Sequence, residues 1–281
     1  SFKMKLINKI SYHIIELIDK HIHRKKVIAL LNKILVKPKY ILDIGAHKGS
    51  YTDQFLNFNR NANIILFEPN IYLYKKLLIK YKNKKNIKIL NYGVGEKNSK
   101  EKFLINKNSD YVSSFSKINN KSKYLLIRNL VFGSFKNKVK KTNVHVKKLD
   151  SILALKRKKI DLMKIDVEGY EEKVLNGGKS ILKRTKIILI EFHKDDLYKD
   201  YDHNSIHSKL LKSKFKLFKS IKFPFMQWED ILKNKHQSFV FKKQQPDKSI
   251  IDKIVEEIHT KCPSKQNRVL YDLRILDWSN E

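Results

Sequence analysis

The sequence predicts an α/β protein: a doubly wound, mostly parallel β-sheet with an antiparallel closing strand and helical additions at both ends. From residue 40 onward, short apolar runs alternate with segments of helical periodicity, and strands joined through helices pair in parallel with right-handed crossovers. The first apolar run ends in a turn with two glycines, at the sheet edge where α/β proteins bind ligands. The last two apolar runs have no helix between them, which predicts an antiparallel closing strand.

Residues 1–38 precede this alternation and are predicted to form a helical lid. Between Met4 and Val36, apolar residues recur at helical spacing, while lysine and histidine occupy the other face. One interpretation is a lid of one or two amphipathic helices that packs on the main domain. The alternative is a basic amphipathic surface that rests on a membrane.

The first half of the alternation contains three strands and two helices. The strands are predicted at Tyr40–Ala46, Asn63–Pro69 and Ile87–Gly95, and the helices between them at Ser50–Phe58 and Ile71–Tyr81. Each strand is a short, mostly apolar run, whereas each helix repeats its apolar residues every three or four positions. This order is that of β-α-β units, which place neighbouring strands in parallel.

The alternation of strands and helices is then interrupted. Two further strands are predicted, "EKFLIN" and "NVHVKKL", on either side of a polar insertion at residues 107–142. After the insertion the alternation resumes. The predicted elements are a helix near Ser151–Lys156, a strand at Ile160–Asp166, a helix at Tyr170–Leu182, a strand at Lys186–Phe192, a helix around Ser205–Ser213, and strands at Phe215–Lys222 and Ser238–Lys243. We therefore predict a main domain at residues 39–243, followed by a C-terminal helical appendage at residues 244–281.

The formal net charge of +33, from 61 basic and 28 acidic residues, would usually indicate a nucleic-acid or membrane partner. Nearly all of the basic residues are lysine, and they are spread along the chain rather than gathered in one stripe. This pattern is typical of a compositional bias with a solvated surface, and it disfavours a nucleic-acid partner. An acidic substrate, or peripheral membrane contact through the N-terminal helices, remains compatible with the charge.

The chain has one cysteine, Cys262, which excludes an internal disulfide and a thiolate metal cluster. No apolar run approaches the roughly 20 residues that span a bilayer. The first ten residues lack a secretory apolar core and a cleavage site. These observations predict a cytoplasmic protein, with a membrane-peripheral location as the alternative.

The turn "DIGAHKGS" after the first strand indicates what the sheet edge binds. Gly45 lets the backbone turn sharply and approach a ligand, and Gly49 does the same where the helix begins. The spacing differs from the G-x-G-x-x-G of a dinucleotide site, and Asp43 would repel a pyrophosphate. Its carboxylate instead suits the cationic amino-acid group of S-adenosylmethionine. Glu68 ends the second strand, where a carboxylate can accept hydrogen bonds from both hydroxyls of a ribose.

Four segments in this order, "DIGAHKGSYT", "FEPN", "KIDVEGYEEKVLNGG" and "IILIEFH", resemble the FkbM family of S-adenosylmethionine-dependent methyltransferases. The resemblance covers about Tyr40–Lys243. It implies the class I methyltransferase (Rossmann-like) fold and transfer of a methyl group to oxygen. Acceptors in this family are typically hydroxyls of sugars or of polyketide-type natural products.

The resemblance also assigns residues to the cofactor. The first turn matches the family's cofactor loop, Glu68 its ribose acid, and Gly93–Gly95 the turn beside the adenine; His47 stands where relatives often have asparagine. The predicted cofactor-binding residues are Asp43, Gly45, Ala46, His47, Gly49, Ser50, Tyr51, Glu68, Pro69, Asn70, Gly93, Val94 and Asp166.

The candidate catalytic residues are Asp166, Glu168 and His193, which follow or end neighbouring strands. A hydroxyl acceptor needs a general base, and either a carboxylate or a histidine can take its proton. The alternative for Asp166 or Glu168 is a purely structural role as the cap of the following helix. Lys164 is expected to share a face with Asp166 and to pair with a carboxylate.

The acceptor pocket is expected to form from loops above these strand ends. The candidate acceptor-binding residues are Ser113, Ser114, Lys164, Glu191, Phe225 and Trp228. A divalent cation held by Asp166, Glu191 and His193 is an option that the sequence does not require.

The sequence thus predicts an S-adenosylmethionine-dependent O-methyltransferase that modifies a sugar hydroxyl of a glycan, a polysaccharide precursor or a glycosylated natural product. One alternative is a ribose methyltransferase acting on RNA. A second alternative is a binding module that holds S-adenosylmethionine without turnover. Base methylation is disfavoured, because "DVEGY" follows the fourth strand where an Asn- or Asp-Pro-Pro-aromatic turn would hold a flipped base.

Overall fold

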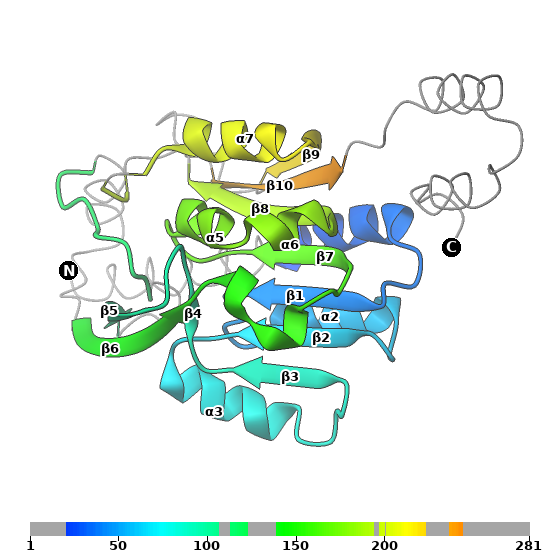
Figure 1. Cartoon of the computed structure of the whole chain (residues 1–281), viewed down its shortest axis with the longest axis horizontal. Helices are drawn as coiled ribbons and strands as arrows, with labels where there is room; N and C mark the ends of the chain where they lie inside the picture. The colour runs from blue at the N-terminus through cyan, green and yellow to red at the C-terminus, as the bar shows by residue number, and fades with distance from the viewer. Residues whose placement is uncertain are drawn as a thin grey trace, which may run out of the picture. The chain divides into compact units, whose positions relative to one another are not determined.

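A seven-stranded mixed sheet, with strand order β3-β2-β1-β7-β8-β10-β9, forms the centre of the protein in the computed structural model (Figure 1). The structure describes residues 21–106, 113–122, 139–193, 197–199, 201–222 and 236–243. The strands of this sheet are β1 (Tyr40–Ile44), β2 (Asn63–Phe67), β3 (Ile87–Leu90), β7 (Ile160–Ile165), β8 (Thr185–His193), β9 (Phe215–Lys222) and β10 (His236–Lys243). A smaller sheet, in the order β4-β6-β5, contains β4 (Gly93–Val94), β5 (Ser99–Asn106) and β6 (Val139–Lys147).

Helices alternate with the strands as the sequence predicts. They are α2 (Ser50–Phe58), α3 (Ile71–Lys80), α5 (Glu171–Gly177), α6 (Lys179–Lys183) and α7 (His203–Lys212), with short 3₁₀ turns η1 (Leu149–Ser151) and η2 (Leu153–Leu155). Residues 21–34 are also helical. The described residues up to Lys242 belong to one compact unit, while the predicted C-terminal appendage lies outside the described residues. The division of the chain after residues 38 and 243 stays a prediction.

The strand order reverses at β1, and this reversal positions the site. β1 pairs in parallel with β2 on one side and with β7 on the other, and β2–β3 and β7–β8 are parallel as well. β10 pairs antiparallel with β8. The predicted doubly wound sheet with an antiparallel closing strand is therefore confirmed. In such sheets, a crevice opens at the carboxyl ends of the strands beside the reversal.

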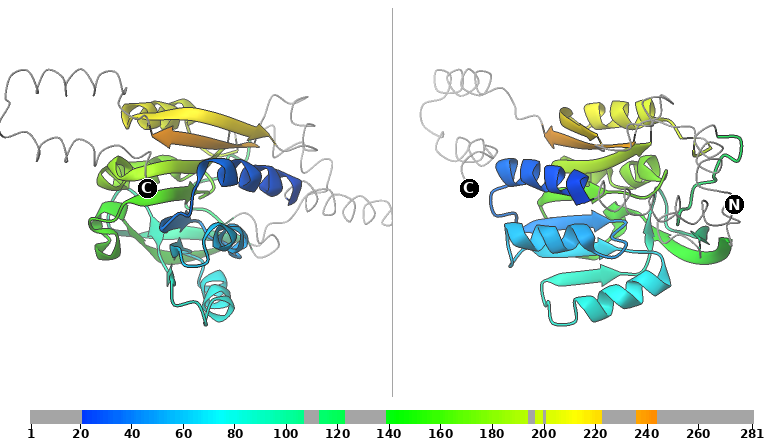
Figure 2. Two further views of the ribbon diagram at one scale, coloured as in Figure 1. Left: turned by 90° about the vertical axis from the view of Figure 1, so that its right-hand side faces the viewer. Right: turned by 180° about the vertical axis from the view of Figure 1, so that it is seen from behind.

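Helices cover both faces of the main sheet (Figure 2). Alternating side chains of the central strands fill two apolar layers, one on each face. Leu42 and Ile44 of β1 lie in the layer covered by α5, α6 and α7, whereas Ile41 lies in the layer covered by residues 21–34, α2 and α3. The two-residue period of a strand produces this division. By the same period, Asp43 belongs to the layer of Ile41, which decides its role below.

Two predicted elements after the insertion differ in the structure. The helix expected near Ser151–Lys156 is wrong: the chain forms η1 and η2 instead. Leu149, Ile152 and Leu155 are buried in the core, and their spacing of three matches the three-residue period of a 3₁₀ turn. The helix expected at Tyr170–Leu182 is interrupted at Gly178, which lies between α5 and α6, because consecutive glycines lower helix stability.

The third predicted strand, Ile87–Gly95, is divided between the two sheets. β3 ends at Leu90, and β4 pairs with β6 rather than with the main sheet. Asn91 and Tyr92 separate the two strands. The side-chain amide of Asn91 donates hydrogen bonds to the carbonyl oxygens of Glu68 and Pro69 at 2.9 and 3.2 Å. The chain thereby leaves the main sheet beside the end of β2, close to the predicted ribose acid.

The N-terminal helical segment packs on the sheet in the part that the structure describes. Val27 and Leu31 are fully buried, in the same apolar cluster as Ile41 and Phe55. Amphipathic periodicity therefore predicted helix correctly for residues 21–34, and its apolar side faces the protein. In the described part of the chain, no helix has the length and apolar character needed to cross a bilayer.

Candidate active site

A cavity of about 190 Å³ opens at the carboxyl ends of β1, β2 and β7. It brings together most of the residues that the sequence singles out. The predicted residues that line it are Gly45, Ala46, His47, Ser50, Tyr51, Glu68, Pro69, Gly93, Val94, Ser113, Lys164, Asp166, Glu168 and Glu191. The cavity therefore lies at the crevice beside the strand-order reversal, where parallel α/β sheets bind ligands.

The first turn follows β1 and passes close to β2 and β7. The backbone N–H groups of Gly45 and Ala46 both donate to the carbonyl oxygen of Phe67, at 3.0 and 3.1 Å. Gly45 has a φ of 79°, and a Cβ atom at this position would collide with the carbonyl oxygen of Asp166. The sequence therefore needs glycine here for two reasons, the left-handed backbone and the close approach of β7.

Gly49 directly precedes α2 and does not line the cavity. Its φ is 74°, and a side chain would collide with the Tyr81 hydroxyl, which hydrogen-bonds the Gly49 carbonyl oxygen at 2.9 Å. Asn70 also lies outside the wall, because its side-chain oxygen accepts from the Tyr72 N–H at 3.0 Å and caps α3. Both residues shape the loops after β1 and β2 without lining the cavity.

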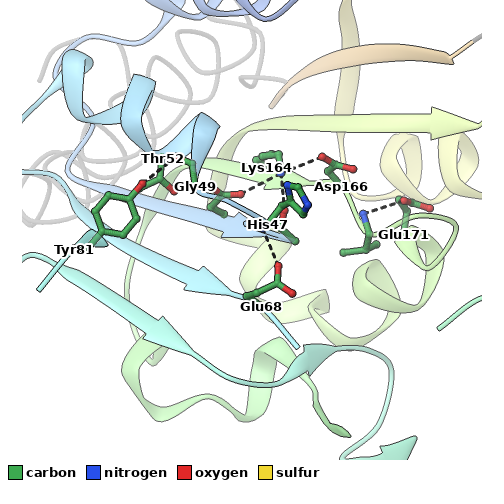
Figure 3. A network of polar contacts seen from close by, with 11 residues as sticks. His47, Gly49, Thr52, Glu68, Tyr81, Lys164, Asp166 and Glu171 are labelled. Carbon is green, nitrogen blue, oxygen red and sulfur yellow. Dashed lines mark hydrogen bonds and ion pairs between the residues drawn. The ribbon is translucent and has the colours of Figure 1, made fainter. Parts of the chain in front are cut away.

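Glu68 reaches the cavity from the end of β2 and is held by backbone groups. Its Oε2 accepts from the His47 N–H and its Oε1 from the Asn70 N–H, both at 2.8 Å (Figure 3). The residue is 5% exposed, and burial raises its pKa to about 7, although the two N–H groups and Lys164 oppose this shift. Each carboxylate oxygen has a second acceptor position, so Glu68 fits a ligand with two neighbouring hydroxyl donors.

Asp43 differs from the expectation that its carboxylate faces the ligand. The residue has no exposed surface and does not line the cavity. Its Oδ2 accepts from the Thr52 hydroxyl at 2.7 Å, and its Oδ1 lies 3.2 Å from Lys164 Nζ. The expected direct contact with an amino-acid group is therefore corrected: Asp43 supports the turn from beneath, through Lys164.

Lys164 joins three parts of the site in one ion-pair network. Its Nζ donates to the Gly45 carbonyl oxygen at 2.9 Å and lies 3.2 Å from both Asp43 Oδ1 and Asp166 Oδ2 (Figure 3). Burial lowers the pKa of Lys164, but Asp166 and Asp43 more than offset it, so that the net shift is upward. The predicted pairing of Lys164 with a carboxylate is confirmed, and the lysine is a buried cation at the base of the site.

Asp166 is the carboxylate that this network presents to the cavity. Its side chain is 28% exposed, whereas the side chain of Asp43 is fully buried. Burial raises the pKa of Asp166 to about 6; Lys164 lowers it, and the nearby charges of Glu191 and Glu168 raise it. A carboxylate with this pKa is ionised at neutral pH and can still accept a proton from a substrate.

The loop that follows β7 is fixed from both sides. Glu168 has a φ of 54°, and its Oε2 accepts from the Tyr198 hydroxyl at 2.6 Å, while its carbonyl oxygen accepts from the Ser114 hydroxyl at 2.6 Å. Glu171 is fully buried, and its Oε1 accepts from the N–H groups of Val167 and Gly169 at 3.2 Å. No side chain caps α5 among the described residues, so Asp166 and Glu168 do not serve as its cap.

Aromatic side chains form one wall of the cavity. Phe103 of β5 and Tyr170 also line the cavity, and Phe115 lies between them with ring centroids at 4.7 and 4.9 Å. A side chain at Gly93 would collide with the Phe115 ring. Phe115 directly follows the candidate residues Ser113 and Ser114, whereas Phe103 lies on β5 and carries no motif.

A second missed group comes from the N-terminal helix, since His23 and Arg24 also line the cavity. Of the remaining acceptor candidates, Ser113 lines the cavity, whereas Ser114 hydrogen-bonds the loop after β7. The side chain of His193, and Phe225 and Trp228, lie outside the described residues. Within the described part of the chain, no cluster of three or more histidine, cysteine, aspartate or glutamate residues could hold a metal ion.

The fold and the cavity together define a class of protein. A doubly wound sheet with a close-approach glycine turn after β1 and a buried glutamate after β2 is the Rossmann-like arrangement for a ligand with a nucleoside part. Residues 43–217, more than half of the chain, match the model of the methyltransferase FkbM domain. The chain therefore belongs to the FkbM methyltransferase family, as the four sequence segments predict.

The solved structures that this chain resembles have low sequence identity to it. A methyltransferase FkbM from Methylobacillus flagellatus has a TM-score of 0.46 at 13% identity, over 72% of this chain and 44% of its own. An rRNA methylase from Streptococcus thermophilus has a TM-score of 0.43 at 10% identity, over 78% of this chain and 95% of its own. A precorrin-6y C5,15-methyltransferase from Geobacter metallireducens has a TM-score of 0.40 at 11% identity, over 78% of this chain and 87% of its own. The chain spans less than half of the Methylobacillus protein, and no curated protein matches it.

Proposed function

We propose that this chain transfers a methyl group from S-adenosylmethionine to a hydroxyl oxygen of a sugar-containing acceptor. The observation that carries the proposal is the position of Glu68, a buried carboxylate with unused acceptor positions beside a turn of close-packed backbone. Family membership supports the reaction class. The choice of a sugar-containing acceptor is supported by the aromatic wall and by the carboxylates that line the same cavity.

The donor half of the cavity is built from backbone and one carboxylate. Glu68 would accept hydrogen bonds from the two ribose hydroxyls, because each of its oxygens has one position left after the N–H of His47 or Asn70. The turn at Gly45 exposes backbone to the ligand, and Gly93 and Val94 close the side of the cavity next to the small sheet. When bound there, the donor supplies an electrophilic methyl group on a sulfonium sulfur.

The acceptor half supplies a base and an apolar wall. Asp166 accepts the proton of the acceptor hydroxyl, and Lys164 fixes the orientation of that carboxylate through the 3.2 Å ion pair. Phe115 and Tyr170 present ring surfaces in the same cavity, and the apolar face of a sugar ring packs well on aromatic rings. Ser113 and Glu191 line the same cavity and would bind the remaining hydroxyls.

The proposal is tested by measuring methyl transfer from labelled S-adenosylmethionine to sugar nucleotides, glycosides and RNA oligonucleotides in parallel. Asp166→Asn should lower the rate about 10²- to 10⁴-fold, the usual contribution of a general base, while the affinity for S-adenosylhomocysteine changes less than tenfold. Glu172→Gln, on α5 and outside the cavity wall, is the matched control and should leave the rate unchanged. Transfer to RNA but to no sugar, or an unchanged rate in Asp166→Asn, would overturn the assignment.

A further inference from the structure

Arg24 is a partly buried cation at the edge of the cavity. It lies on the helix at residues 21–34, before the segment that matches the family model, and it lines the cavity. Its Nε atom is buried and has no hydrogen-bond partner among the described residues. Burying this single N–H donor without an acceptor costs free energy, so the geometry favours an acceptor that arrives with a ligand.

The position of Arg24 relates it to one end of the donor site. Its guanidinium carbon lies 5.6 Å from the centroid of the Tyr51 ring, and Tyr51 belongs to the first turn of α2, directly after the glycine turn. Gly49, the residue before α2, provides no side-chain cap. Ser50 and Tyr51 of the first turn line the cavity together with Arg24, and the positive end of the helix and the guanidinium both favour a negative group there.

The other cation near Tyr51 is already engaged. Lys164 Nζ lies 5.2 Å from the Tyr51 ring centroid, but it also hydrogen-bonds the Gly45 carbonyl oxygen and pairs with Asp43 and Asp166. A ligand carboxylate would have to compete with these oxygens for Lys164. Arg24 has no such competitor among the described residues, and its planar fork matches a carboxylate in two hydrogen bonds.

We infer that Arg24 binds the α-carboxylate at the methionine end of the methyl donor. This assignment rests on the proposed function and adds a residue from outside the family-matched segment. The carboxylates of Asp166, Glu168 and Glu191 line the same cavity, so an anionic acceptor would meet repulsion there. An amino-acid zwitterion instead presents a carboxylate to Arg24 and an ammonium group to the acidic side chains.

The test compares three ligands by isothermal titration calorimetry at fixed pH and salt. S-adenosylhomocysteine carries the whole amino acid, its decarboxylated analogue lacks only the carboxylate, and 5′-methylthioadenosine lacks the amino acid. The unaltered protein should bind S-adenosylhomocysteine about 10- to 100-fold more tightly than the decarboxylated analogue, as expected for a hydrogen-bonded charged pair. Equal affinities for these two ligands would overturn the assignment without any variant.

Arg24→Gln should weaken S-adenosylhomocysteine binding by the same factor and leave the affinities for the other two ligands unchanged. Lys25→Gln removes the same charge from an exposed position on the same helix and serves as the control. A uniform loss for all three ligands would mean that Arg24 only supports the fold. If Arg24→Gln bound S-adenosylhomocysteine normally but had a raised KM for the acceptor, Arg24 would bind the acceptor and not the methyl donor.

The two proposals fail in different ways. If the unaltered protein binds none of the three adenosine ligands, the proposed function is wrong and the assignment of Arg24 falls with it. If it binds all three equally, the donor site stands and only Arg24 is misassigned. Selective loss of the carboxylate-bearing ligand in Arg24→Gln supports both.

Discussion

The tips of β1 and β2 each carry one carboxylate, yet the structure uses the two in opposite ways. Asp43 is fully buried between Thr52 and Lys164, whereas Glu68 lines the cavity and is held only by backbone N–H groups. Asp43 lies within β1 and points into the layer of Ile41, while Glu68 follows the last residue of β2. Asp43 pairs with Leu66 of β2, and Glu68 lies two positions beyond Leu66. The carboxylate inside its strand therefore supports the fold, whereas the one beyond the end of its strand lines the cavity.

The largest effect should come from removing the cation that Asp43 needs. Lys164→Met leaves a fully buried carboxylate without its ion pair, which should lower the free energy of unfolding by about 3–5 kcal/mol. Urea denaturation followed by circular dichroism measures this loss. Lys186→Met breaks the partly exposed pair with Asp161 at 3.2 Å and should cost at most about 1 kcal/mol. Equal losses in the two variants would contradict the buried role of Asp43.

Glu68→Gln should act on the ligand rather than on the fold. It removes the charge that accepts the ribose hydroxyls, so the affinity for S-adenosylhomocysteine should fall about 100-fold. Calorimetric titration measures the affinity, with Glu96→Gln, exposed and outside the cavity wall, as the control. If Glu68→Gln bound S-adenosylhomocysteine as tightly as the unaltered protein, Glu68 would not be a ligand-binding carboxylate.

A smaller effect is expected from pH. Because burial raises the pKa of Glu68 to about 7, the ionised form that accepts hydroxyl donors dominates above pH 7 and declines below it. The affinity for 5′-methylthioadenosine should therefore be constant above pH 7.5 and fall by up to about tenfold per pH unit below pH 6.5.

His23 and His47 also line the cavity, so a variant must show whether Glu68 causes the pH dependence. Glu68→Gln should abolish the pH dependence if the carboxylate causes it. A pH profile that persists in Glu68→Gln would assign it to a histidine instead.

The main sheet could be predicted from the sequence because its signals are local. The bounds of α2 and β9 match the predicted segments, since apolar periodicity and turn residues define each element independently. The third strand could not be predicted in full: its division after Leu90 depends on the amide of Asn91 and on the pairing of β4 with β6. Such contacts link residues that are distant in the sequence.

The sequence predicted those parts of the candidate site in which a motif requires a particular backbone conformation. Gly45 and Glu68 were found because a sharp turn and a strand end each restrict the residue type. The orientation of Asp43 was missed, although the two-residue period of β1 already places it on the face of Ile41. Arg24 and Phe103 carry no motif, because only tertiary packing brings a helix before β1 and a strand of the second sheet to the same cavity.

The central claim, that Glu68 holds the ribose of the methyl donor, is tested most directly by a crystal structure of the protein with S-adenosylhomocysteine. The account predicts both ribose hydroxyls within hydrogen-bond distance of the Glu68 carboxylate, and the sulfur facing Asp166. A ligand bound elsewhere, or a ribose turned away from Glu68, would contradict it.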